Sequence, residues 1–222
     1  YAMELEDMLL SCSYNFKKCT HNDFEWYFDN FYGNCYRFNA NKNKESNIST
    51  RSGKQNGLQI ELFVGEPNNP FSLDPTAGVQ VYVHNKSIIP FTFDGFQAPV
   101  GKSTNVAISR YFIKNMPYPY TECDDKIELS NSILVKSLFN ANYTYTQKEC
   151  FLLCYQMHLT NACNCYDLSF PFLTFNKPPC HNLAQISCNL YEYIKFHSQD
   201  LRKKCGSYCP LECSAVLYTT SI

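Results

Sequence analysis

Two cysteine-rich stretches carry most of the information about the fold: TQKECFLLCYQMHLTNACNC at residues 146–165 and KKCGSYCPLEC at residues 203–213. The first stretch opens with Thr146 and, three residues later, Glu149, which is the capping-box pattern of a helix start. Apolar residues and cysteines then follow at intervals of three and four, as on one face of a helix. A helix is therefore predicted to start at this point.

The last ten cysteines divide evenly around the turn between this helix and a second one. Cys150 and Cys154 lie one helical turn apart on one face, and Cys205 and Cys209 have the matching interval. In an antiparallel hairpin, residues near the turn meet each other and outer residues meet outer ones, so nested disulfides are predicted. The predicted pairs are Cys165 with Cys180, Cys163 with Cys188, Cys154 with Cys205, Cys150 with Cys209, and Cys123 with Cys213. Each bridge contributes about 2–4 kcal/mol, so this half of the chain should be rigid enough to transmit a mechanical signal.

The second helix is predicted from about Leu183 to Lys203, and Pro210 closes it off. The residues expected to face inward are Ile186, Leu190, Ile194 and Leu201. The tail from residue 215 to 222 is rich in β-forming residues, and we expect it to return to a sheet.

The cysteine content points to the cell exterior. Thirteen cysteines are far too many for casual core residues and indicate an oxidising compartment or metal sites. Three glycosylation sequons, at Asn47, Asn85 and Asn142, favour the secretory route. The odd count leaves one thiol without a partner, either because its partner is in another chain or because it lies in a part of the protein outside this sequence. We favour the second interpretation.

Composition narrows the classes of function. The 222 residues are 45% hydrophobic, enough to bury a core, and the formal charge of −1 gives no attraction for polyanions, which argues against nucleic acid as a partner. Apolar runs stop after a few residues, well short of the ~20 that a membrane span needs. The N-terminus has no signal-peptide pattern, so the sequence is interpreted as an internal fragment.

The first half of the chain is predicted to be mainly antiparallel β structure. Residues 1–31 have apolar residues at helical spacing together with the Cys12 and Cys19 pair, which predicts a short stapled helix. Residues 39–57 are polar and are expected to form a solvated loop that contains the first sequon. Alternating apolar residues in 58–64 and 79–83 predict half-buried strands, and a further strand is expected over 106–113.

Metal and catalytic alternatives have weaker support. Cys163 and Cys165, with His158 and His181 nearby, could supply zinc ligands, but the two-residue spacers of common zinc modules are absent. Cysteines in an oxidising setting leave almost no thiolate for catalysis, so no enzyme and no cofactor are predicted. Surface or packing positions are expected for the histidines, namely His21, His84, His158, His181 and His197.

Several local sequences, in order along nearly the whole chain, resemble one family, the degenerin/epithelial sodium channels. They are Leu10-Ser11-Cys12 with Cys19, Tyr32-Gly33-Asn34-Cys35-Tyr36-Arg37-Phe38-Asn39, Met116-Pro117-Tyr118-Pro119-Tyr120-Thr121-Glu122-Cys123, and Cys209-Pro210-Leu211-Glu212-Cys213. The resemblance implies the extracellular region of a trimeric, sodium-selective, amiloride-sensitive channel of the plasma membrane. Sodium would pass through a pore outside this sequence, subunits would form homo- or hetero-trimers, and an extracellular peptide is one candidate ligand.

The fold implied by the resemblance is α+β, with an antiparallel β palm and β-ball, a disulfide-laddered helical-hairpin thumb and a helical finger. Residues 1–34 would be a finger segment, 35–122 the palm and β-ball strands, 123–208 the thumb, and 209–222 a strand that returns to the palm. The gating stimulus is left open between ligand, peptide and mechanical force.

The resemblance also implies roles for single residues. In the family, the cysteine that matches Cys35 pairs with one shortly after the first membrane helix. Tyr120 takes the place of a wrist aromatic that couples thumb to gate in relatives, although a simple turn aromatic in a Pro-rich bend is an equal interpretation. Acid-sensing relatives carry two carboxylates where this sequence has Leu190 and Ile194, so weak or no gating by protons is predicted.

One alternative from a different class stays open. A secreted cysteine-rich binding protein would use the odd thiol for an intermolecular bridge and the hairpin as a recognition surface. Composition alone permits this alternative, and only the ordered motifs argue against it.

Overall fold

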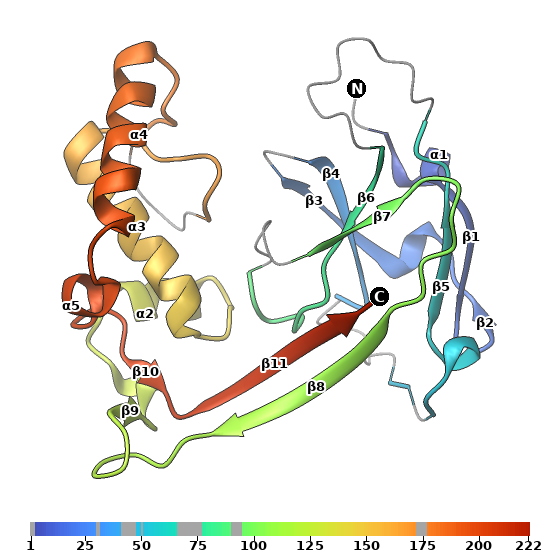
Figure 1. Ribbon diagram of the computed structural model, residues 1–222, viewed down its shortest axis with the longest axis horizontal. Helices are drawn as coiled ribbons and strands as arrows, with labels where there is room; N and C mark the ends of the chain where they lie inside the picture. Colours follow the sequence, from blue (N-terminus) through green and yellow to red (C-terminus); the bar gives the residue numbers. More distant parts are fainter. Residues whose placement is uncertain are drawn as a thin grey trace. The chain divides into compact units, whose positions relative to one another are not determined.

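The computed structural model describes residues 3–29, 32–40, 48–49, 51–65, 77–89, 95–171 and 177–222, with only the backbone at Leu201 and Arg202. The chain divides into two compact units. Unit 1 comprises residues 1–86, 92–108 and 220–222, and unit 2 comprises residues 87–91 and 109–219. Each unit is described by itself below. The fold mixes helices and strands, in agreement with the α+β class, and Figure 1 shows the strands of unit 1 and the helices of unit 2.

Unit 1 consists of small antiparallel sheets. Its elements are α1 (Leu5–Met8), β1 (Leu9–Tyr14), β2 (Lys17–Lys18), η1 (His21–Asp23), β3 (Phe24–Asp29), β4 (Gly33–Phe38), η2 (Lys54–Asn56), β5 (Leu58–Leu62), β6 (Gly78–Val81) and β7 (Phe96–Pro99). β1 lies between β2 and β5, β3 pairs with β4, and β6 pairs with β7. Trp26 lies opposite Tyr36 in the β3–β4 pair.

Unit 2 contains the helices and the main core. Its elements are β9 (Cys123–Asp124), η4 (Ile127–Leu129), α2 (Ile133–Asn140), α3 (Gln147–Cys163), α4 (Leu183–His197), α5 (Leu201–Cys205) and β10 (Leu211–Glu212). The strands β8 (Ala107–Lys114) and β11 (Ser214–Ser221) pair with each other, and β9 pairs in parallel with β10. Tyr155 and Phe196 are among the largest side chains that are fully buried in this core.

Local sequence explains where the helices of unit 2 begin and end. The Thr146 hydroxyl accepts the Glu149 N–H at 3.3 Å and caps α3 as predicted. The side chains of Ser132 and Asn182 cap α2 and α4 in the same way. α3 ends at Asn164, whose φ of 57° is left-handed, a conformation that asparagine tolerates better than most residues.

Three expectations about secondary structure were wrong in part. The stapled segment at the N-terminus is a strand hairpin, because α1 has only four residues and Cys12 lies in β1, bonded to Cys19 just after β2. The second helix is broken after His197, where the polar residues 198–200 form a turn before α5. β5 is exposed over most of its length and is not half-buried, whereas β6 is half-buried as expected.

The inward face of α4 is also different from the expectation. Ile186, Leu190 and Ile194 are 50%, 62% and 62% exposed. The buried face of the same helix carries Glu192 and Phe196. α4 thus has apolar side chains on its outer face as well as on its inner one, which is uncommon for a helix at a surface.

Candidate functional site

Five disulfides hold unit 2 together and form a ladder through its helices. The bonded pairs are Cys123–Cys213, Cys150–Cys209, Cys154–Cys205, Cys163–Cys188 and Cys165–Cys180, with Cα–Cα distances between 4.9 and 6.2 Å. They are the same pairs as those expected from the nested arrangement. A sixth bridge, Cys12–Cys19, lies in unit 1. Two adjacent rungs start one helical turn apart on α3, so this helix is fixed at two points to the end of α5 and the turn after it.

A hydrogen bond joins the two long helices between their disulfides. His158 of α3 and Glu192 of α4 contact each other with 2.6 Å between Nε2 and Oε2. The Glu192 side chain is only 10% exposed, and its other oxygen lies 3.5 Å from the Lys195 amine. The hydrogen bond from His158 holds the pKa of Glu192 below its ordinary value, with a smaller contribution from the charge of Lys195. Glu192 is thus held as a carboxylate inside the helix pair.

A polar network continues this contact along the helices. The Tyr155 hydroxyl donates to Asn189 at 2.6 Å, and the Asn189 amide donates to the Asp167 carboxylate at 2.8 Å. Gln156, which is fully buried, donates to the carbonyl oxygens of Asp167 and Phe170 at 2.6 and 3.0 Å and accepts the Asp167 N–H at 3.0 Å. The Gln156 side chain is therefore satisfied in the core. This network was not among the expectations from the sequence.

Aromatic rings fill the space beside the network. Tyr155 makes edge contacts with Phe170 and Phe196, with ring centroids 5.1 and 5.2 Å apart. Burial raises the pKa of Tyr155, and the nearby Asp167 charge raises it further. The Lys204 amine lies 4.5 Å from the centre of the Phe196 ring, and burial lowers its pKa. These contacts fix α3, α4 and the last turn of α5 as one packed body.

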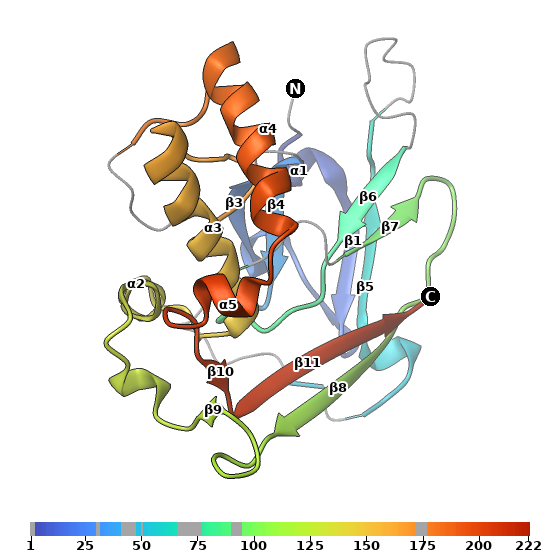
Figure 2. The same ribbon diagram turned by 60° about the vertical axis from the view of Figure 1, so that its left-hand side comes forward.

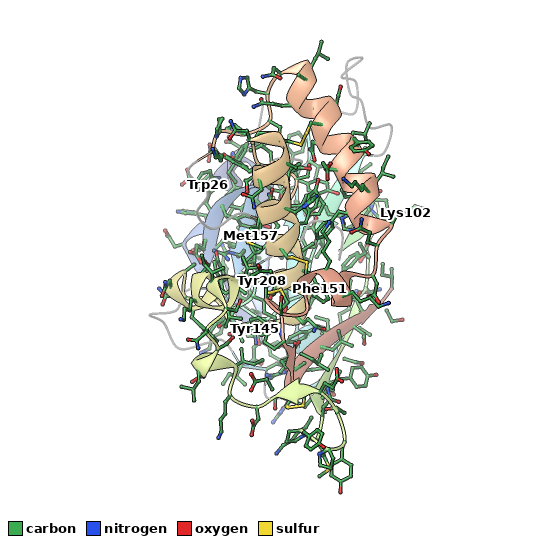
Figure 3. The ribbon with its side chains drawn as sticks, turned by 90° about the vertical axis from the view of Figure 1, so that its left-hand side faces the viewer. Trp26, Lys102, Tyr145, Phe151, Met157 and Tyr208 are labelled. Atoms are coloured by element: carbon green, nitrogen blue, oxygen red, sulfur yellow. A yellow bond between two sulfur atoms is a disulfide. The ribbon has the colours of Figure 1, made fainter. Side chains whose placement is uncertain are left out.

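The base of this body is bonded to the segment that leads into β11. The Tyr145 hydroxyl donates to the Pro210 carbonyl oxygen at 2.5 Å, and the Gln147 side chain donates to the Cys209 carbonyl oxygen at 3.0 Å. The Gln147 N–H donates to the Glu212 carboxylate at 3.0 Å. Figure 3 shows Tyr145 and Tyr208 near the lower end of α3, with Phe151 and Met157 along the same helix. Hydrogen bonds therefore connect the start of α3 and the residue before its cap to residues 209–212.

The loop that contains Tyr120 begins at the same junction. Asn115 N–H donates to the Cys213 carbonyl oxygen at 2.7 Å, and Cys213 is bonded to Cys123 at the other end of the loop. Within the loop, Tyr120 N–H donates to the Pro117 carbonyl oxygen at 3.1 Å. The Tyr120 side chain itself is 73% exposed. The structure thus places the expected coupling aromatic on a turn that is fixed at both ends.

Cys35 is the one cysteine with a free thiol, a statement that covers all thirteen since every cysteine lies among the described residues. It lies in β4 of unit 1, half-buried, opposite Tyr27 of β3. Burial raises the pKa of the Cys35 thiol. A protonated thiol is a poor nucleophile, so this environment offers no activation for catalysis.

The three sequons differ in what the structure says of them. Asn142 is exposed in the turn that follows α2, with a left-handed φ of 59°. Asn85 is half-buried, and its carbonyl oxygen lies 2.8 Å from His84 Nδ1. Asn47 lies outside the described residues. Asn142 is accordingly the better placed of the two described sequons for a glycan.

The remaining features concern metals and membranes. Within the described ranges, no three His, Cys, Asp or Glu side chains are grouped so that they could hold a metal ion. His158 is engaged with Glu192, and His181 Nδ1 lies 3.0 Å from the Pro179 carbonyl oxygen. The same part of the chain contains no helix with the length and apolar character needed to cross a membrane.

Comparison with known proteins gives the family. The family described as "Amiloride-sensitive sodium channel" matches residues 1–222. Degenerin del-1 of Caenorhabditis elegans is 30% identical over 97% of this chain and 32% of its own length. Degenerin mec-10 of the same species is 29% identical over 97% of this chain and 29% of its own length.

Vertebrate relatives give the same result. The epithelial sodium channel subunit gamma of Pelodiscus sinensis is 29% identical over 94% of this chain and 31% of its own length. The chain thus spans about a third of the curated relatives that it matches. On the family match over all its residues, the chain belongs to the amiloride-sensitive sodium channel family.

Proposed function

We propose that this chain is the extracellular gating region of a subunit of a trimeric, sodium-selective, amiloride-sensitive cation channel in the plasma membrane. The observation that carries the proposal is the family match over the whole chain, joined to the disulfide-laddered helix pair of unit 2. Of the relatives, the Pelodiscus sinensis protein is named as a sodium channel subunit and the Caenorhabditis elegans proteins as degenerins. The chain accordingly has no catalytic role and no cofactor, and it acts with related subunits as a homo- or hetero-trimer.

The parts of the chain are assigned to the family's regions as follows. Residues 1–34 form a finger segment, 35–122 the palm and β-ball, 123–208 the thumb, and 209–222 the strand that returns to the palm. The thumb assignment is supported by the five bridges and the buried helix contacts of unit 2. A bound extracellular ligand such as a peptide, or a mechanical strain, shifts the closed-to-open equilibrium through this rigid body.

The path from thumb to gate runs through the base of α3. A displacement of α3 is passed by Tyr145 and Gln147 to residues 209–212, and by the Cys123–Cys213 bridge to the loop that carries Tyr120. Because these contacts are short and closely packed, residues 209–212 and the loop that carries Tyr120 move with the helices. Tyr120 then couples the movement to the first membrane helix.

This coupling has a direct test. Tyr120→Ala should lower open probability in the full-length channel while surface abundance is unchanged. Tyr191→Ala is the matched control, since Tyr191 is 64% exposed on α4 of the same unit. Single-channel recording with surface biotinylation measures both quantities. An equal effect of the two substitutions, or none at Tyr120, would remove Tyr120 from the coupling path.

Two modifications belong to the same proposal. Cys35 forms a disulfide with a cysteine outside these 222 residues, and Asn47, Asn85 and Asn142 carry glycans. Mass spectrometry of the full-length protein after digestion without reduction identifies the partner of Cys35. A free Cys35 thiol on a protein isolated from the cell surface contradicts this assignment.

The membrane location separates this proposal from a secreted binding protein. The full-length protein, expressed in animal cells, should remain in the membrane fraction and be labelled from outside by an impermeant reagent. Recovery of the product from the culture medium, with no labelled membrane form, would instead support the secreted alternative.

A further inference from the structure

The disulfide-closed hairpin of unit 1 has an exposed tip with an unusual backbone. The two turn residues between β1 and β2, Asn15 and Phe16, have φ of 49° and 63°, both in the left-handed region. Such a turn normally carries glycine or asparagine, because a bulky side chain is disfavoured there. Phe16 is also 70% exposed, so packing in a core does not explain its position. An outlier of this kind points to a role for the exposed ring.

Four exposed basic side chains lie around this tip. Tyr14, the last residue before the turn, pairs with Leu58, the first residue of β5. The segment that leads into β5 therefore meets the hairpin at the tip end, and Figures 1 and 2 show its helical turn η2, in cyan, where β5 begins. We call these four side chains the basic tip: Lys17 and Lys18 of β2, Arg51 of the segment before η2, and Lys54 of η2.

The charges of the basic tip are not neutralised by neighbouring groups. Within the described part of the chain, none of the four side chains forms an ion pair. Residues 9–19 and 51–60 contain no aspartate or glutamate. Glu61 lies farther along β5, opposite Ser11, whose hydroxyl donates to its carboxylate at 3.1 Å. The formal charge of −1 for the whole chain thus conceals a local group of four positive charges, and such a group attracts polyanions.

The backbone that carries these charges is held in place. The Ser49 hydroxyl donates to the Arg51 carbonyl oxygen at 2.7 Å, and the Gln59 side chain donates to the Lys54 carbonyl oxygen at 3.0 Å. Gly53 lies between the two cations with a φ of 108°, which residues with a side chain rarely adopt. The disulfide of the hairpin fixes the two lysines of β2 in the same way. Ordered segments lose less conformational freedom on binding than mobile ones do.

We propose that the basic tip binds a sulfated glycosaminoglycan chain outside the cell. The inference rests on the extracellular location in the proposed function. Clusters of lysine and arginine are typical of surfaces that bind heparin-like chains. On the outer side of the membrane, sulfated polysaccharides are the densely charged polyanions, whereas nucleic acids and anionic phospholipid surfaces lie on the inner side.

The arrangement of the cations favours a chain with repeated charges over a single small anion. Lys17 and Lys18 are successive residues of a strand, so their side chains point to opposite faces of the hairpin. A small anion can contact only one face, whereas a polysaccharide can pass around the tip and contact both. The exposed ring of Phe16 supplies an apolar surface against which a sugar ring can pack, a contact that an acidic peptide does not require.

Binding of heparin by the purified full-length protein in a neutral detergent tests the inference. The variant combines Lys17→Gln with Lys18→Gln. The control combines Lys177→Gln with Lys203→Gln, which removes the same charge from two exposed lysines of unit 2. Surface plasmon resonance on immobilised heparin measures the affinity over a range of salt concentrations, with unsulfated hyaluronan and polyglutamate as the other polyanions. Peptide mapping without reduction verifies that the Cys12–Cys19 bridge is intact in each protein.

The tip variant should bind heparin about thirtyfold more weakly at physiological salt, while the control is unchanged. The slope of log Kd against log salt should fall by about two, because each cation in contact releases about one counterion. Lys17→Arg with Lys18→Arg should keep the affinity, since the charge is kept.

Four results would each overturn the inference: no heparin binding by the unaltered protein, equal losses in the two glutamine variants, a loss in the arginine variant as large as in the glutamine one, or equally tight binding of hyaluronan or polyglutamate. None of them bears on amiloride-blocked sodium current, so the proposed function can stand when this inference fails.

Discussion

Removing single rungs of the disulfide ladder should cost different amounts of stability, and the difference follows from nesting. The inner variant is Cys154→Ala with Cys205→Ala, and the outer variant is Cys123→Ala with Cys213→Ala. All four residues are buried, with exposures of 7% or less, so the loss of packing is similar in the two variants. The bridges close 51 and 90 residues when each is considered alone.

For isolated loops of these lengths, the chain-entropy relation gives about 4 and about 5 kcal/mol at 25 °C. Nesting changes both values. The Cys150–Cys209 and Cys163–Cys188 bridges already close a ring, and the inner bridge divides this ring into two loops of about 8 (4 + 4) and about 26 (9 + 17) residues. The two loops together constrain the chain like a single loop of about six residues, so loss of the inner bridge costs about 2 kcal/mol. The outer bridge, with the Cys150–Cys209 bridge intact, closes about 31 residues and contributes about 4 kcal/mol.

Urea unfolding of the oxidised chain, followed by far-ultraviolet circular dichroism, measures both free energies of unfolding. The outer variant should lose about 2 kcal/mol more than the inner one. Equal losses, or a larger loss for the inner variant, would show that the rungs are not nested in the folded protein, and the reasoning about the ladder would fail.

Three further predictions concern the helix pair. Phe196→Ala should destabilise the chain by about 3–5 kcal/mol because it leaves a cavity in the core. Leu190→Ala on the outer face of α4 should change stability by no more than about 0.5 kcal/mol. Urea unfolding compares the two variants, and a larger loss for Leu190→Ala would contradict the packing described for α4. The pKa of Glu192 is lower in the folded state than in the unfolded state. Its contribution to stability is therefore present above its ordinary pKa and is lost as the pH falls through its folded pKa. Glu192→Gln should make the free energy of unfolding less dependent on pH on the acid side, and an unchanged acid slope would count against the His158 contact. Mild acidification of the intact channel should evoke little or no current, because Leu190 and Ile194 cannot share a proton, and a robust acid-evoked current in whole-cell recording would contradict this.

Local chemistry made the start of α3 and the disulfide pairs predictable. Thr146 directly precedes α3 and Glu149 lies in the first turn of the same helix, so no tertiary information was needed. The nested order of cysteines depends only on the chain reversing direction once between residues 165 and 180. The structure has the same bridges because that reversal is the main feature of unit 2.

The prediction of which side chains of α4 face inward was wrong because this helix carries apolar residues on both of its faces. Ile186, Leu190 and Ile194 form a regular stripe, and spacing alone cannot say which stripe faces the core. The sequence did contain the deciding signal. Cys188 must face α3 if it pairs with Cys163, and Glu192 and Phe196, four and eight residues later, share its side of the helix.

The N-terminal segment and the polar network show two other limits. Leu5 and Met8 occupy little more than one helical turn, too short a window to distinguish a helix from the strand that follows. Gln156 and Asp167 come together only because the chain after α3 folds back over the helix, a contact that no local pattern encodes. Such contacts between distant residues are what the structure adds.

The most direct test of the extracellular gating role is a current recorded from the full-length protein, expressed alone and with related subunits. An inward sodium current that amiloride blocks, and whose open probability falls when the Cys123–Cys213 bridge is removed without loss of surface protein, is the expected result. A protein that reaches the cell surface in every combination of subunits and carries no amiloride-blocked current, or one whose current is unaffected by loss of that bridge, would contradict it.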